Sequence, residues 1–211
     1  TEAERFGERY LQFADHDGLR LEITARAEGP DSEWASEGIP ADKAIKGFGG
    51  AVLYSTYPDH TAVTLEQVMG LQKIASDDTW VRFKGSGELG QVIDMNANAM
   101  ERGHGGYGTV HHIAWRAKDF KDHEAWKQHV ERNGFETTPI IDRQYFNAIY
   151  FREGGGILFE IATDPPGFTL DEAFEELGSN LKLPPQYEPH RDQINRMLPP
   201  IEIRSVEDRK R

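Results

Sequence analysis

The sequence predicts an α+β protein in which β-α-β-β-β units repeat along the chain and form curved mixed sheets. An internal repeat and two segments that read as strand, helix and further strands are the main indications. A third indication is the composition, since 211 residues with 37% hydrophobic and 28% charged side chains are typical of a soluble globular protein.

The internal repeat relates residues 5–24 to residues 143–162 at a constant offset of 138 residues. Both segments have the apolar pattern of two strands joined by a glycine-containing turn, and glycine supplies the positive φ that tight hairpins need. A fainter third copy occupies residues 79–95, where Asp94 takes the position of a glutamate in the other two copies. The matched pairs are Arg5 with Arg143, Phe13 with Phe151, Gly18 with Gly156, Glu22 with Glu160, and Ile23 with Ile161.

Two helices are predicted, each ahead of a group of strands. The first is expected to begin near Thr64, because Thr64 and Gln67 have the spacing of a capping box. The second covers about residues 119–133, where apolar residues recur on one face and Gly134 is a natural residue to end the helix.

A strand precedes each helix, at residues 50–55 and 109–116. Residues 45–96 and 109–163 are therefore predicted to be complete β-α-β-β-β repeats, called here the middle repeat and the last repeat. Residues 1–25 match only the last hairpin of such a repeat, so we expect its first part to be missing or truncated.

The other segments are predicted to connect or follow these repeats. Residues 26–44 and 97–108 are expected to be linkers because they are rich in small, polar and charged residues. Residues 164–211 are expected to form a C-terminal tail, with short helices near residues 171–177 and 188–197.

Composition excludes several classes of function. The formal charge of −12 argues against nucleic acid, whose binding depends on neutralising phosphates. No apolar run approaches the roughly 20 residues that cross a membrane. The absence of cysteine excludes disulfides and thiolate metal sites, so a metal would need His, Asp or Glu ligands. With no signal-peptide pattern at its start, the chain is expected to be cytoplasmic. Homo-oligomer formation is left open.

His112 and Glu160 are the candidate metal ligands. Side chains alternate between the two faces of a strand, so the predicted strand 109–116 can direct His112 into a site while His111 faces away. Glu160 lies in the nearly apolar segment ILFEIA, and an unpaired buried carboxylate is unfavourable. Two His and one carboxylate are the ligands of many non-haem Fe(II) sites.

The residues also allow a purely structural interpretation. A histidine in an apolar strand is frequently a hydrogen-bonded core residue, and Glu160 could form an ion pair with Arg143 or Arg152. The pairing of a histidine on the first strand with a glutamate on the last strand of one repeat favours the metal site.

Three segments carry a resemblance to a known family: GTVHHIAWRAKD at residues 108–119, residues 133–160, and LPPQYEPHRDQINRMLPPI at residues 183–201. With the repeated units, they resemble the vicinal-oxygen-chelate superfamily, and within it the hydroquinone-type ring-cleaving (extradiol) dioxygenases of the glyoxalase family. The resemblance implies that His112 and Glu160 bind the metal. It also implies that Arg143 and Tyr150 belong to the outer sphere of the active site and that His111 is associated with it.

The function that this resemblance implies is Fe(II)-dependent cleavage of a hydroquinone or catechol by dioxygen, with Mn, Zn or Ni as other candidate metals. Tyr150 and Arg143 would orient the substrate and stabilise developing negative charge, and His111 would assist proton transfer. Two alternatives stay open at this point. One is a glyoxalase-like metal-dependent lyase or isomerase, and the other is a non-catalytic ligand-binding or resistance protein of the same fold.

One departure from the family concerns its other histidine ligand, which lies in an HHIT-type strand at the start of the full protein. Residues 1–211 contain no such strand. By the resemblance, residues 1–25 end the second of four repeats, and the middle and last repeats are the third and fourth. We therefore expect on the order of 100 further N-terminal residues, nearly two repeats of this size, to supply the third ligand.

Overall fold

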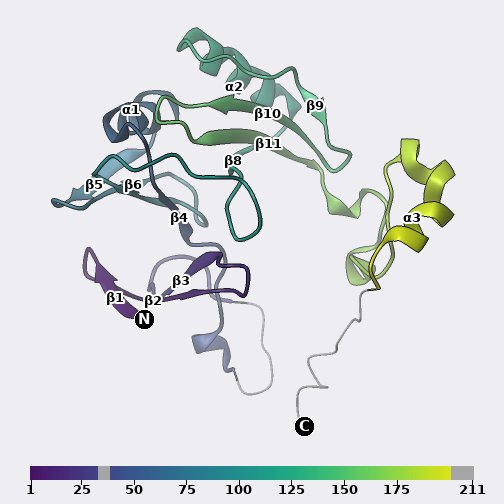
Figure 1. Ribbon diagram of the computed structural model, residues 1–211, viewed down its shortest axis with the longest axis horizontal. Helices are drawn as coiled ribbons and strands as arrows, with labels where there is room; N and C mark the ends of the chain where they lie inside the picture. The colour runs from purple at the N-terminus through teal and green to yellow at the C-terminus, as the bar shows by residue number, and fades with distance from the viewer. Residues whose placement is uncertain (33–38, 201–211) are drawn as a thin grey trace. The chain divides into compact units, whose positions relative to one another are not determined.

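The computed structural model describes residues 1–32 and 39–200 (Figure 1). The chain divides into two compact parts, residues 1–165 and the C-terminal residues from Pro166 onward. All the repeats and all the candidate site residues belong to the first part. No helix in the described ranges is both long and apolar enough to cross a membrane.

The first sheet, called here the N-terminal sheet, consists of three antiparallel strands: β1 (Glu2–Arg5), β2 (Glu8–Ala14) and β3 (Arg20–Thr24). Strands β2 and β3 form the hairpin that the sequence predicts. Strand β1 was missed, because its sequence EAER lacks an alternating apolar pattern.

The middle repeat forms a four-stranded sheet in the order β4-β7-β6-β5, with β4 parallel to β7. In the chain, its helix follows the first strand and precedes the other three. Its elements are β4 (Gly50–Leu53), α1 (Pro58–Val63) continued by a π-helical turn (Thr64–Val68), β5 (Gln72–Ser76), β6 (Trp80–Lys84) and β7 (Val92–Asn96).

The last repeat has the same topology, with strand order β8-β11-β10-β9 and β8 parallel to β11. The predicted α+β architecture of repeated β-α-β-β-β units and mixed sheets is therefore confirmed. Its elements are β8 (Ile113–Ala117), α2 (Phe120–Arg132), β9 (Ile141–Asp142), β10 (Phe146–Arg152) and β11 (Leu158–Pro166).

The predicted start of the first helix was wrong. The helix begins at Pro58, because proline at the first helical position lacks only an amide that would have no partner there. Thr64 lies within the helical segment, where its hydroxyl donates to the carbonyl of His60 at 3.0 Å, so it is not a cap. The second helix agrees with the sequence, since the side chain of Asp119 accepts from the amide of Asp122.

The C-terminal part, described by itself, holds short helical elements. In place of the helix predicted at residues 171–177, there are two 3-10 turns, Phe168–Leu170 and Phe174–Glu176. The second predicted helix is present as a 3-10 segment, Pro185–His190, followed by α3 (Arg191–Met197). Parts of the predicted linker at 26–44 and of the predicted tail lie outside the described residues.

The repeat found in the sequence is reproduced in backbone conformation. Strands β2 and β10 each contain seven residues and coincide at the 138-residue offset. The turn glycines Gly18 and Gly156 have φ of 91° and 92°. Phe6 and Gln144, the described non-glycine residues with positive φ, are also equivalent and have φ of 52° and 69°.

The turns of the two hairpins also share their hydrogen bonds. The carboxylate of Asp15 accepts from the backbone amides two and four residues further along, at 2.9 and 2.8 Å. The carboxylate of Glu153 accepts from the amides at the same spacing, both at 2.8 Å. Positions at this offset can therefore be compared residue by residue.

The hydrophobic core contains the helices and the apolar sheet faces of the middle and last repeats. Two histidines of α2 also form hydrogen bonds with the backbone of neighbouring elements. The Nε2 of His123 is 2.8 Å from the carbonyl oxygen of Ile161 on β11, and the Nε2 of His129 is 3.0 Å from the carbonyl oxygen of Val68. The core residues include Leu65, Val68 and Met69 from the first helix, Val130 from α2, and Phe83, Ile93, Met95, Ile149, Phe151, Phe159 and Ile161 from the strands.

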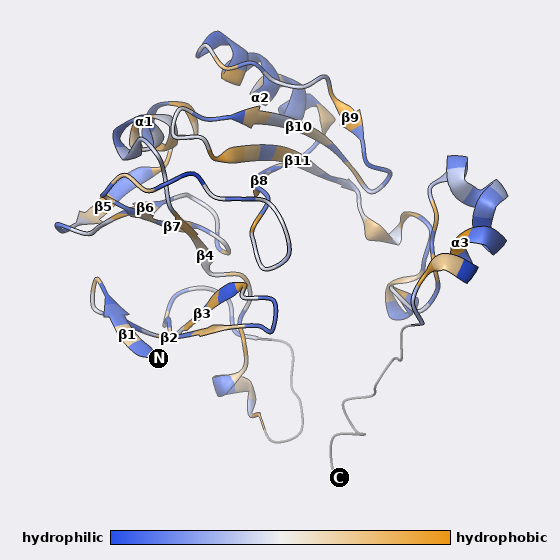
Figure 2. Cartoon of the chain, viewed as in Figure 1, coloured by the Kyte–Doolittle hydropathy of each residue, from blue (hydrophilic) through white to orange (hydrophobic). Residues whose placement is uncertain are grey.

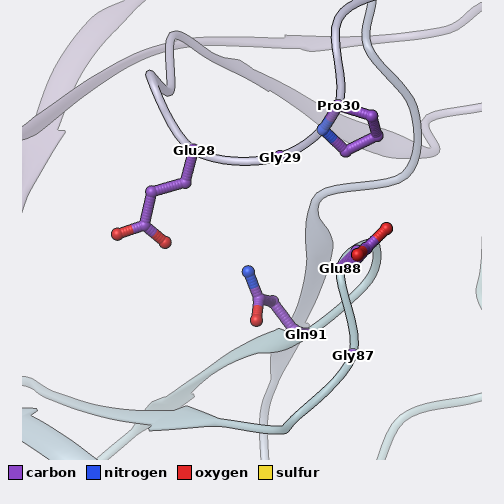
Figure 3. A pocket seen from close by; sticks show the side chains of 6 residues that line it. All are labelled: Glu28, Gly29, Pro30, Gly87, Glu88 and Gln91. Carbon is purple, nitrogen blue, oxygen red and sulfur yellow. The ribbon is translucent and has the colours of Figure 1, made fainter.

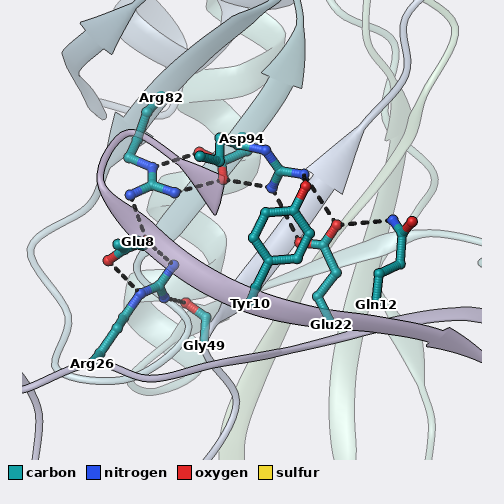
Figure 4. A network of polar contacts seen from close by, with 9 residues as sticks. Glu8, Tyr10, Gln12, Glu22, Arg26, Gly49, Arg82 and Asp94 are labelled. Carbon is teal, nitrogen blue, oxygen red and sulfur yellow. Dashed lines mark hydrogen bonds and ion pairs between the residues drawn. The ribbon is translucent and has the colours of Figure 1, made fainter. Parts of the chain in front are cut away.

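A buried ionic network joins the N-terminal sheet to the sheet of the middle repeat (Figure 4). Arg5 pairs with Glu22 at 3.0 Å and with Asp94 at 2.9 Å. Arg82 pairs with Asp94 at 2.7 Å and with Glu8 at 2.6 Å. Because Arg5 and Asp94 are 5% and 4% exposed, these charges stabilise the contact only as a complete set.

The arginines decide the charge of Asp94. Burial alone would raise the pKa of its carboxyl, but the hydrogen bonds and charges of Arg82 and Arg5 outweigh burial and hold the pKa below its ordinary value of 3.8. Asp94 is therefore ionised at neutral pH and serves as the shared anion of both arginines.

We predict that Asp94→Asn strongly destabilises the protein, because it leaves two buried arginines short of their shared anion. Removing one partner of a buried pair costs about 3–5 kcal/mol. Urea denaturation at neutral pH measures the loss. Arg116→Met, which breaks the exposed pair of Arg116 and Asp164, is the control and is expected to cost under about 1 kcal/mol. Equal losses in the two variants would contradict the structural role of the network.

Acid is expected to remove the contribution of Asp94. Because its folded-state pKa is lowered, ionised Asp94 stabilises the folded state above about pH 4, and this contribution is lost as the pH falls through the folded-state pKa. Urea denaturation from about pH 5 to about pH 3 should show a steeper fall in the free energy of unfolding for the wild type than for Asp94→Asn. Parallel profiles would count against this assignment.

Candidate metal centre

His112 and Glu160 lie in contact in the last repeat. The Nε2 of His112 is 2.6 Å from a carboxylate oxygen of Glu160, and the two side chains are 33% and 4% exposed. The parallel pairing of β8 with β11 places Glu160 opposite Ala114. His112 lies immediately before β8, close enough for its side chain to reach that of Glu160.

The expected alternation of His111 and His112 was wrong, because β8 begins only at Ile113 and both histidines precede the hydrogen-bonded ladder. The Nδ1 atoms of the two imidazoles are 2.9 Å apart, and the rings meet edge to face at 5.2 Å. His111 is therefore beside His112 and exposed, and its contact with Nδ1 leaves the Nε2 of His112 directed at Glu160.

Tyr150 and Arg143 belong to the same cluster. Tyr150 is on β10, its ring lies 5.8 Å from that of His112, and the carboxylate of Glu160 acts on its hydroxyl. Arg143, in the turn after β9, donates to the Tyr150 oxygen at 3.3 Å. The structure thus brings together all five residues that the sequence selected for the site.

Burial raises the pKa of Tyr150, the charge of Glu160 raises it further, and Arg143 opposes the shift. The phenol is therefore protonated at neutral pH. Arg143 donates a hydrogen bond to the phenol oxygen and supplies positive charge there.

Thr138 is a positioning residue that the sequence did not reveal. Its hydroxyl accepts from the amide of Tyr150 at 3.1 Å, and its own amide donates to the carbonyl of Tyr150 at 2.9 Å. These bonds fix the backbone that carries the phenol. A single threonine outside any recognisable motif gives no sequence signal for this role.

The carboxylates at the position of Glu160 in the other two copies are neutralised by arginine. Glu22 pairs with Arg5, and Asp94 pairs with both Arg5 and Arg82. In the described residues, the ion-pair partner of Glu160 is His112, which is charged only when protonated. Glu160 is therefore buried without the permanent cation that its equivalents have.

The two arginines proposed as alternative partners of Glu160 are engaged elsewhere. Arg143 is directed at the oxygen of Tyr150, and Arg152 donates to the carbonyl of Gly156 at 2.6 Å. The structural alternative of an arginine ion pair is thus not realised. An imidazole nitrogen and a buried carboxylate that converge fit the donor set of a divalent transition metal.

The middle repeat cannot build the same pair. Gly50 occupies the position of His112, as the equivalent registers of β4 with β7 and β8 with β11 show. A Cβ at Gly50 would be 1.8 Å from the carbonyl oxygen of Val92, so no side chain fits there without backbone movement. The combination of histidine and carboxylate belongs to the last repeat.

Among the described residues, no third protein ligand accompanies the pair. Residues 1–32 and 39–200 contain no cluster of three or more His, Cys, Asp or Glu side chains arranged to hold a metal ion. Another hollow of the surface, an open pocket of about 420 Å³, is lined by none of the five site residues (Figure 3). Its lining is Glu28, Gly29, Pro30, Gly87, Glu88 and Gln91.

Known proteins resemble this chain in both sequence and structure. The provisionally named ring-cleaving dioxygenase MhqO of Bacillus subtilis (strain 168) is 52% identical over 207 residues, which are 98% of this chain and 66% of MhqO. Chlorohydroquinone/hydroquinone 1,2-dioxygenase of Sphingobium indicum is 34% identical over 204 residues, 92% of this chain and 63% of that protein. The chain thus spans just under two thirds of the length of these relatives.

A crystal structure of a provisionally assigned dioxygenase from Bacillus subtilis superposes with a TM-score of 0.93 and 52% identity, over 98% of this chain and 66% of that one. The profile of the Glyoxalase/Bleomycin resistance protein/Dioxygenase superfamily matches residues 49–171, which include both complete repeats and the five site residues. The chain belongs to this superfamily, the vicinal-oxygen-chelate family that its sequence resembles.

Proposed function

We propose that the chain carries most of the active site of an Fe(II)-dependent dioxygenase that cleaves the ring of a hydroquinone-type aromatic diol. The observation that carries the proposal is the buried carboxylate of Glu160, which faces His112 and Tyr150 and lacks the arginines of its two equivalents. The names of the relatives, ring-cleaving dioxygenase and hydroquinone 1,2-dioxygenase, support the reaction and the substrate class.

His112 and Glu160 are the proposed ligands. Nitrogen and oxygen donors without thiolate suit Fe(II), and they also accept Mn, Zn or Ni. Bound iron would supply a centre at which the diol and dioxygen are held side by side. Because a facial site of this kind has three protein ligands, we propose that the third comes from polypeptide outside residues 1–211.

The surrounding residues have separate roles in the proposal. Tyr150 holds a proton at its hydroxyl and can redirect it from Glu160 to an oxygen of the substrate. Arg143 keeps the phenol in place and adds positive charge where negative charge develops on the diol. His111, exposed beside His112, can accept the proton of the substrate hydroxyl.

The function can be tested in a chimaera that joins the residues of MhqO outside the match to residues 1–211 of this protein. We expect the chimaera, reconstituted with Fe(II) without oxygen, to bind iron stoichiometrically and to consume dioxygen when hydroquinone is added. An oxygen electrode and metal analysis measure both. An iron-loaded chimaera that consumes no dioxygen with hydroquinone or catechol would refute the proposed reaction.

Tyr150→Phe in the same chimaera is expected to retain iron and to lower kcat about 100-fold or more, as loss of a hydrogen-bond donor to a developing oxyanion does. Glu160→Gln, in contrast, should lose iron and activity together. Tyr57→Phe, at a tyrosine that is 63% exposed, is the control and should leave both unchanged. Equal loss of iron and turnover in Tyr150→Phe would instead assign Tyr150 to the support of the metal ligands.

Because Glu160 has no permanent cation as its partner, we predict that replacing Glu160 has little effect on the stability of the fold. In metal-free protein at about pH 8, Glu160→Gln should change the free energy of unfolding by under about 1 kcal/mol or stabilise the fold. Asp94→Asn, at the equivalent position, is the matched control and should cost about 3–5 kcal/mol. Urea denaturation with EDTA measures both, and equally large losses would make Glu160 a structural ion-pair residue.

A further inference from the structure

One face of the N-terminal sheet is apolar and exposed. Leu11 and Phe13 on β2 lie directly opposite Ile23 and Leu21 on β3, so the four side chains form one patch. They are 50%, 41%, 49% and 40% exposed. Hydrophobic residues of these strands are orange in Figure 2. We call these four residues the apolar face of the N-terminal sheet.

The equivalent residues of the last repeat are completely buried. At the 138-residue offset, they are Ile149, Phe151, Phe159 and Ile161, with exposures of 0%, 2%, 0% and 1%. They share a core cluster with Val130 of α2, and Trp126 of the same helix packs against that cluster. An amphipathic helix therefore contributes to the burial of this face in the last repeat.

The middle repeat follows the same rule. Asp94 and Glu160 are equivalent, which places Phe83, Ile93 and Met95 at the positions of Phe13, Leu21 and Ile23. These three residues are 0%, 2% and 1% exposed, and they share the core cluster with Leu65 and Val68 of the helical segment. In both complete repeats, this sheet face is covered and the helix lies in the core beside it.

The opposite face of the N-terminal sheet is already occupied. Arg5, Glu8 and Glu22 project from it into the ionic network with Arg82 and Asp94 (Figure 4). The sheet therefore has one polar face that is engaged and one apolar face that is exposed. A soluble protein rarely leaves a contiguous apolar patch uncovered unless something binds it.

We propose that the apolar face of the N-terminal sheet binds one amphipathic α-helix, supplied by polypeptide outside residues 1–211. The helix lies on Leu11, Phe13, Leu21 and Ile23 as α2 lies beside their equivalents, with apolar side chains three and four residues apart. About a third of MhqO lies outside the match, which is ample for a helix of the 13 residues of α2.

The area of the patch favours a helix over a second copy of the chain. A stable interface between proteins buries roughly 800 Å² on each partner. Four side chains that are at most half exposed provide much less. They match instead the narrow apolar stripe of a single helix, held in place by the rest of its own chain.

The absence of cysteine allows a direct test by labelling. Ile23→Cys reports on the apolar face, and Ile74→Cys is the matched control, because both isoleucines are 49% exposed. In the 211-residue chain, both should react with a maleimide at similar rates. In the chimaera with the remaining residues of MhqO, we expect the rate at position 23 to fall by more than tenfold and the rate at position 74 to stay the same.

Hydrogen–deuterium exchange on the chimaera should also show a protected helical stretch within the added MhqO residues. Leu11→Cys repeats the labelling on the neighbouring strand, in case Ile23→Cys folds poorly. An unchanged rate at both positions, or protection without a protected helix, would overturn the proposal. Protection in the 211-residue chain that disappears on dilution would overturn it too, because a second copy would then be the occupant.

This test requires neither iron nor turnover. A chimaera that protects position 23 and consumes no dioxygen would leave the docking surface in place and refute only the proposed reaction. A chimaera that consumes dioxygen while position 23 stays reactive toward the maleimide would support the proposed reaction and refute the docking surface.

Discussion

The final strand of each repeat carries a carboxylate that is buried (Asp94, Glu160) or partly buried (Glu22), and such a carboxylate requires a compensating charge or a set of hydrogen bonds. Glu22 and Asp94 meet this requirement with Arg5 and Arg82, and in doing so they fix the N-terminal sheet on the middle repeat. Glu160 meets it with a histidine and a tyrosine. The carboxylate at this position is thus paired with a permanent cation in two copies and with a histidine in the third.

The two faces of each sheet divide the work of the fold. In the middle and last repeats, one face is apolar and lies in a core that includes the helix of the same repeat, as Phe159 and Ile161 do with Val130. The other face carries the carboxylate and its partners. In these two repeats the apolar side stabilises the fold, and the polar side differs: it holds an arginine network in the middle repeat and the cluster of the proposed metal site in the last repeat.

Within the candidate site, the sequence could identify side chains but not their contacts. His112 and Glu160 were selected because a polar residue in an apolar strand is costly, and in the structure His112, just before β8, is in contact with Glu160 on β11. The alternation argument for His111 was wrong. Both histidines precede the first hydrogen-bonded residue of β8, and outside the strand successive side chains need not point to opposite faces. Thr138 was not foreseen, because a hydroxyl that fixes a distant backbone leaves no pattern in the sequence.

The sequence by itself determined the repeated architecture, the family and the five residues of the site, because hydrophobic periodicity, turn glycines and the 138-residue repeat are local properties of the chain. The tertiary structure alone decided which buried carboxylate lacks an arginine, since Arg5 reaches Asp94 across 89 positions and no local rule predicts that pairing. It also decided that Leu11, Phe13, Leu21 and Ile23 are exposed while their equivalents are buried. Burial depends on which element packs against a face, and that is a property of the whole fold.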